Sequence, residues 1–97
     1  MPAYVIVNVH VKDPELYKEY VAAAPPTIER HGGRYVARGG EVWVREGSWS
    51  PERLVVLEFP DAQAARRWYE SPEYQEVLAI RQRAAEAELV ITEGLPS

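Results

Sequence analysis

Two side chains of the 97-residue sequence could carry acid–base chemistry, His10 and Glu58. Histidine titrates near neutral pH, and a carboxylate removed from water keeps its proton more easily, so either group could act as a general base. Each also has a structural interpretation: His10 as a polar residue at a strand end, and Glu58 as half of an ion pair with Arg38 or Arg34. His31 lies at a predicted helix end, where a cation interacts favourably with the helix dipole.

Other side chains could complete a small-molecule site around these groups. Asn8 could donate a hydrogen bond, and the guanidinium of Arg38 could hold a ligand carboxylate through two parallel hydrogen bonds. Trp43 could stack on a planar ligand, although Trp43 and Trp49 could equally pack between two copies of the chain. The candidate ligand-binding residues are therefore Asn8, His10, Arg38, Trp43 and Glu58, and no residue is assigned a catalytic role.

Four strand-like segments and three helix-like segments must position these residues. Apolar alternation predicts strands over residues 3–11, 34–38, 53–59 and 88–93, and it continues the second strand over 41–46 beyond Gly39-Gly40. Asp13-Pro14 starts a helix that ends at His31-Gly32-Gly33, and Pro25-Pro26 is expected to break or kink it. A second helix follows Pro60-Asp61.

Ser71-Pro72 repeats the cap-and-proline signature, so a third helix is expected from this point. Helical spacing gives this helix a buried stripe made of Tyr74, Val77, Leu78, Arg81 and Ala85.

This element order predicts an α+β fold of the ferredoxin-like β-α-β-β-α-β type, with an antiparallel sheet of order 4-1-3-2 in one domain over residues 1–97. Helices would cover one face of the sheet. The other face is mostly apolar, because it carries Tyr4 and Ile6 from the first strand and Leu54 and Val56 from the third. We expect a second copy to cover it, which gives a homodimeric α/β barrel.

A pocket is expected on this uncovered face. Pairing of the first and third strands would place Glu58 beside Ile6 and diagonal to Asn8, and Arg38 is the preferred partner of the buried carboxylate. Polar groups in an apolar cavity are typical of a site for a small organic molecule.

Composition excludes several other classes of function. The sequence has no cysteine, a net charge of −4 and no apolar run long enough to cross a bilayer, and its first residues are not expected to act as a signal peptide. These features predict a cytoplasmic protein without nucleic-acid or membrane partners. No metal site or phosphate-binding loop is found, and no cofactor is predicted, although His10 or His31 could ligate haem.

A series of short motifs resembles the bacterial domain-of-unknown-function family thirteen-thirty, within the dimeric α/β barrel superfamily. The motifs are His31-Gly32-Gly33-Arg34-Tyr35, Arg38-Gly39-Gly40, Glu46-Gly47, Trp49-Ser50-Pro51, Glu58-Phe59-Pro60 and Trp68-Tyr69-Glu70-Ser71-Pro72-Glu73-Tyr74. The resemblance implies a ferredoxin-like fold and a homodimer, but no agreed reaction. Relatives in the superfamily include cofactor-free monooxygenases, lactone isomerases and haem-binding proteins.

Together, these observations predict a homodimer that binds a small anionic or aromatic molecule on the sheet face without helices. As an enzyme it would be a cofactor-free isomerase or monooxygenase. The alternative is a non-catalytic dimeric scaffold or binding module, in which the polar sheet residues form a structural network.

Overall fold

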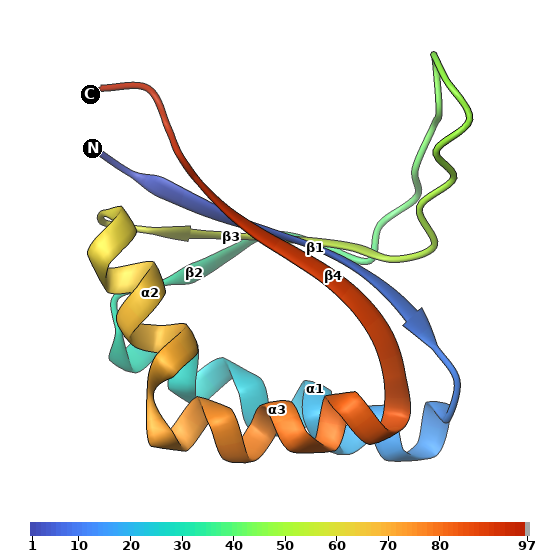
Figure 1. The fold of residues 1–97 in the computed structure, drawn as a ribbon, viewed down its shortest axis with the longest axis horizontal. Helices are drawn as coiled ribbons and strands as arrows, with labels where there is room; N and C mark the ends of the chain where they lie inside the picture. Colours follow the sequence, from blue (N-terminus) through green and yellow to red (C-terminus); the bar gives the residue numbers. More distant parts are fainter. Residues whose placement is uncertain (97) are drawn as a thin grey trace.

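The chain folds into one antiparallel sheet with helices on one side of it (Figure 1). The computed structural model describes residues 1–96. Its elements are β1 (Ala3–Val11), α1 (Pro14–Arg30), β2 (Arg34–Arg38), β3 (Leu54–Phe59), α2 (Ala62–Glu70), α3 (Pro72–Ala84) and β4 (Ala85–Glu93). The sheet order β2-β3-β1-β4, with every pair antiparallel, confirms the predicted ferredoxin-like topology.

Side-chain caps start the three helices where the sequence predicts them. Asp13, Asp61 and Ser71 each accept a hydrogen bond from the backbone N–H three residues further on, at 3.1, 2.7 and 3.2 Å. Pro25 and Pro26 lie inside α1 without ending it, so the expected break does not occur. The helix buries residues on both sides of the two prolines, and this packing offsets the two backbone hydrogen bonds that they remove.

Two strand boundaries differ from the expectation. β2 ends at Arg38, and residues 41–46 form no strand, because the chain turns at Gly39, whose φ is +70°. The segment 39–53 instead forms a long loop that extends from the sheet on the side away from the helices (Figure 1). β4 starts directly after α3 and pairs with β1 over nine residue pairs, from Val11 with Ala85 to Ala3 with Glu93.

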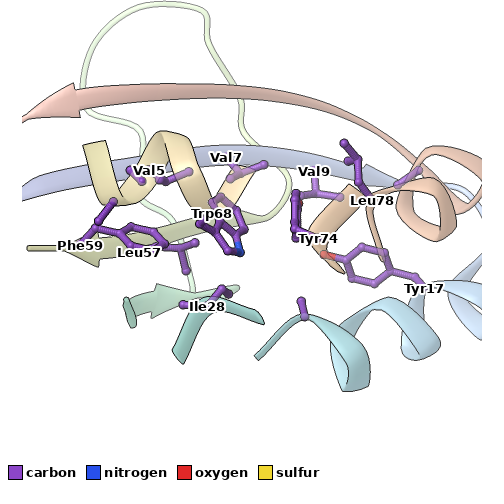
Figure 2. Packing of buried hydrophobic residues seen from close by; sticks show 14 of the residues in the cluster. Val5, Val7, Val9, Tyr17, Ile28, Leu57, Phe59, Trp68, Tyr74 and Leu78 are labelled. Atoms are coloured by element: carbon purple, nitrogen blue, oxygen red, sulfur yellow. The ribbon is translucent and has the colours of Figure 1, made fainter. Parts of the chain in front are cut away.

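The core lies between the helices and the sheet (Figure 2). Trp68 is central to it: its ring lies 4.1 Å from that of Tyr74 and 5.4 Å from that of Phe59, and its indole N–H donates to Thr27 Oγ1 at 3.1 Å. Gly33 closes one end of the core, since a Cβ at this position would lie 2.5 Å from the Phe59 ring.

The predicted stripe of α3 is confirmed. Tyr74, Leu78 and Arg81 are buried and Val77 is half-buried, whereas Ala85, although buried, is the first residue of β4 and lies outside the helix. The stripe is apolar except for Arg81, which is 5% exposed. None of the helices within residues 1–96 is both long and apolar enough to cross a membrane.

Candidate functional site

A β-bulge in β2 decides which side of the sheet Arg38 occupies. Arg34 pairs with Glu58, but Arg38 pairs with Val55, because the register shifts by one residue between Tyr35 and Ala37. A shift of one residue reverses the faces of all the residues that follow. Arg38 therefore lies on the helix side, and the expectation that it pairs with Glu58 is wrong.

Glu58 has other partners on the open face, which is the sheet face without helices. Arg34 Nη2 lies 2.5 Å from Glu58 Oε1, and the Tyr4 hydroxyl donates to Glu58 Oε2 at 3.4 Å. The strand register places Glu58 opposite Tyr4 instead of Ile6, so Glu58 is also further from Asn8 than expected. The alternative partner named from the sequence, Arg34, is the one that the structure contains.

Asn8 and His10 form a second network at the other end of the open face. The amide nitrogen of Asn8 lies within hydrogen-bond distance of His10 Nε2, at 3.2 Å. His10 Nδ1 faces a carboxylate oxygen of Glu52 at 3.5 Å, and the backbone N–H of Glu52 donates to Asn8 Oδ1 at 3.2 Å. These contacts hold the end of the 39–53 loop against β1.

The two tryptophans of this loop lie in different surroundings. Trp43 is 64% exposed. Trp49 is 58% exposed, and it lines a shallow hollow of about 290 Å³ on the open face, together with Ile6, Asn8, Glu88 and Val90. The five candidate residues are thus divided between two faces and a loop, and they do not converge on one pocket.

A different group of polar side chains converges on the helix side of the sheet. A cavity of about 30 Å³ lies there between the sheet, α1 and α3. Aliphatic side chains, Trp68 and three tyrosines form most of its wall, and three arginines reach it: Arg38, Arg53 and Arg81. Each guanidinium lies near the ring of a tyrosine in the same wall. The distance is 4.4 Å from Arg38 to Tyr35, 5.5 Å from Arg53 to Tyr17 and 5.7 Å from Arg81 to Tyr20.

Arg81 is the most deeply buried of these cations. Its Nε and Nη1 atoms are inaccessible to solvent and have no hydrogen-bond partner among residues 1–96, and the same is true of Arg53 Nε. No carboxylate lines this cavity among the described residues. A buried guanidinium without a counter-ion or hydrogen-bond acceptor is costly.

Burial favours the neutral form of two of the cavity tyrosines, Tyr20 and Tyr35, and of Tyr74, whose hydroxyl contacts that of Tyr20. Burial, as the largest cause, raises the pKa of Tyr20, and Tyr74, whose hydroxyl lies 2.8 Å from that of Tyr20, raises it further. Burial likewise raises the pKa of Tyr35 and of Tyr74, against the opposing effect of Arg38 and Arg81, respectively. Phenols held in the neutral form can donate hydrogen bonds to an anion.

The cavity offers no obvious general base or metal ligands. Its lining contains no histidine, aspartate or glutamate in the described part of the chain. Within residues 1–96, no group of three or more such side chains could hold a metal ion. The charged and ionisable groups of the cavity among the described residues are therefore guanidinium and phenol groups, with no carboxylate or imidazole beside them.

Sequence reasoning missed Arg53 and Arg81 as functional candidates. Arg81 carried a usable signal, because it was the one charged residue in a stripe predicted to be buried. Arg53 carried no such signal, because it lies at the boundary between the loop and β3.

The element order, the antiparallel sheet and the helices on one face define a ferredoxin-like α+β protein. The chain belongs to the DUF1330 family, a domain of unknown function, whose sequence profile matches residues 2–95. No curated protein sequence matches the chain.

Several solved structures share the fold. The RPA0582 protein of unknown function from Rhodopseudomonas palustris has a TM-score of 0.71 and 23% identity, over 99% of this chain and 84% of that one. SnoaB, a cofactor-independent oxygenase from Streptomyces nogalater, has a TM-score of 0.70 and 14% identity, over 99% and 95%. A dimeric ferredoxin-like protein of unknown function from Thermobifida fusca has a TM-score of 0.69 and 18% identity, over 97% and 92%.

Proposed function

We propose that this protein binds a small organic anion, such as a carboxylate, with its charged group in the helix-side cavity and with Arg81 and Arg53 as the main ligands of that group. One observation carries the proposal: Arg81 is 5% exposed and has two buried N–H groups without a partner among residues 1–96. An anion would supply the missing acceptors and the missing counter-charge at once, because charge-assisted hydrogen bonds to a guanidinium are strong and directional. This moves the expected ligand site from the open face to the opposite face.

The chemistry of the cavity favours a ligand that arrives already ionised. Arginine and neutral tyrosine hydroxyls stabilise negative charge on a bound ligand and on any enolate or phenolate formed from it. The likeness to SnoaB, described as a cofactor-independent oxygenase, is compatible with such a role but supports it only through the fold. If the protein is an enzyme, we propose that it acts on an anion and needs no proton abstraction by a side chain of the cavity.

Calorimetric titration with benzoate and butanoate tests this proposal. The Arg81→Met variant should weaken binding by about 10- to 100-fold, the value of a charge-assisted hydrogen bond to a buried anion. Arg83→Met is the matched control, because Arg83 is an exposed arginine of the same helix, and it should leave binding unchanged.

Two variants of the open face distinguish a ligand site there from the proposed site in the helix-side cavity. His10→Ala and Glu58→Gln should bind both anions as the wild type does. Loss of binding in these variants, with binding retained in Arg81→Met, would place the ligand on the open face and refute the proposal. Absence of any anion binding would refute it as well.

We also propose that a second copy of the chain covers the open face. This face and the adjoining loop expose large apolar side chains, which are uncommon on a monomer in such number: Val36, Trp43, Val44, Trp49 and Val90. A structural relative described as dimeric has the same fold. In such a dimer, the networks around Asn8 and Glu58 would lie at or near the interface as structural elements.

Sedimentation equilibrium tests the dimer. Val90→Glu should shift the protein towards monomer, because Val90 is 58% exposed in the single chain and an unpaired carboxylate is costly at a buried interface. Ala22→Glu, at an exposed position of α1, is the control and should leave the mass unchanged. A wild-type protein that remains monomeric would contradict the proposal.

A further inference from the structure

The helix-side cavity has a neighbour that is large enough for a whole organic molecule. A groove of about 500 Å³ lies beside β4 and is lined by Tyr69, Arg81, Gln82, Ala85, Ala87, Leu89 and Ile91. Small-molecule sites have volumes of about 300–1,000 Å³, so the groove has the size of a ligand site, whereas the cavity holds little more than one polar group.

Strand geometry explains why one wall of the groove is apolar, while Tyr69, Arg81 and Gln82 contribute polar groups to the rest. Ala85, Ala87, Leu89 and Ile91 are alternate residues of β4, so they share one side of the strand, the side that faces the helices. Figure 1 shows β4 rising from the end of α3 in a long arc, with the helices at one end of it. Leu89 and Ile91 are only half-buried, and Ala87 is exposed.

Arg81 connects the two spaces, because its side chain lines both the cavity and the groove. It is the only charged residue of the groove among residues 1–96. A carboxylate held by Arg81 would therefore have its remaining atoms next to the apolar side chains of β4, with no second charge to satisfy. A partner on the open face would leave this groove free, since the groove lies on the other side of the sheet.

We propose that the β4 groove binds the hydrocarbon body of the ligand, and that the ligand class is an amphipathic monocarboxylate with an unbranched or aromatic body. This inference rests on the proposed anion site and adds the part of the molecule that determines specificity. Gln82 and Tyr69 are the polar groups of the groove wall, so they are the positions at which a single polar substituent on the body would be recognised.

A series of straight-chain carboxylates from butanoate to octanoate tests the inference by calorimetric titration. Each methylene that enters the groove should tighten Kd by about fourfold. Ala87→Phe should abolish this dependence on chain length while the affinity for butanoate stays as in the wild type. Thr92→Phe is the control, since Thr92 is exposed on the opposite face of the same strand, and it should keep the full dependence.

The outcomes distinguish the two proposals. Affinity that is independent of chain length in the wild-type protein, or an unchanged dependence in Ala87→Phe, would overturn the groove and leave the anion site standing. Failure of every member of the series to bind would overturn the anion site itself. If Ala87→Phe does not fold, the slope of the wild-type series alone decides the inference.

Discussion

Replacement of Arg81 by methionine should make the protein more stable and weaken its affinity for the ligand. Arg81 is 5% exposed, and its Nε and Nη1 have no partner within residues 1–96. Each buried, unpaired N–H group costs about 1–3 kcal/mol, and exchange of a buried charged group for an apolar one of similar size is often neutral or stabilising by about 1–4 kcal/mol. Against this, the variant loses a cation–π contact with Tyr20 at 5.7 Å, worth about 1–2 kcal/mol.

The net expectation is a gain of about 1–3 kcal/mol in the free energy of unfolding. For a domain of this size, each kcal/mol raises Tm by about 4–8 °C. Urea unfolding and thermal scans of Arg81→Met, with Arg83→Met as the exposed control, measure the gain. The control should change stability by no more than about 0.5 kcal/mol. If Arg81→Met loses more than about 1 kcal/mol, Arg81 is a structural residue with an adequate partner, and the argument for an anion site fails.

The remaining predictions concern the core that surrounds the cavity. Gly33→Ala should destabilise the fold by about 1–3 kcal/mol in urea unfolding, because the new Cβ would collide with the chain's single phenylalanine ring, and an unchanged midpoint would contradict this packing. Thr27→Val should cost about 1–3 kcal/mol, because the buried indole N–H of Trp68 loses its acceptor, whereas Thr27→Ser should retain most of the stability. The free energy of unfolding should also fall above pH 10.0. Phenols ionise there in the unfolded chain, whereas burial raises the pKa of Tyr20 and Tyr74 and keeps both protonated in the folded state. Urea unfolding across that range, with Tyr20→Phe showing a shallower loss, measures this effect, and a flat profile would refute it.

Local signals predicted the order and type of the elements well. Asp13, Asp61 and Ser71 cap their helices as expected, because a cap depends only on residues within one helical turn. The sheet order followed from the element order, since few topologies satisfy the chirality of the crossovers. The extension over 41–46 failed, because an apolar alternation does not reveal whether a strand is available to pair with it.

The site was less predictable, because it depends on register. A bulge between Tyr35 and Ala37 moved Arg38 to the helix side, and a difference of two positions placed Glu58 opposite Tyr4. The position of Glu58 has no signal in the sequence, since a register difference of two positions keeps the same alternation of side chains. The bulge has none either, since no residue type marks it between Tyr35 and Ala37. By contrast, a single arginine in the buried stripe of α3 was visible from the sequence, and its burial is the observation on which the proposed function rests.

The most direct test of the central claim is a crystal structure of the protein with 4-bromophenylacetate, in which anomalous scattering locates the bromine and electron density locates the carboxylate. The account predicts the carboxylate within hydrogen-bond distance of Arg81 Nε and Nη1, with the bromine beside Ala87 and Leu89 in the β4 groove. A carboxylate bound on the open face beside Asn8 or Glu58, with no density at Arg81, would contradict it.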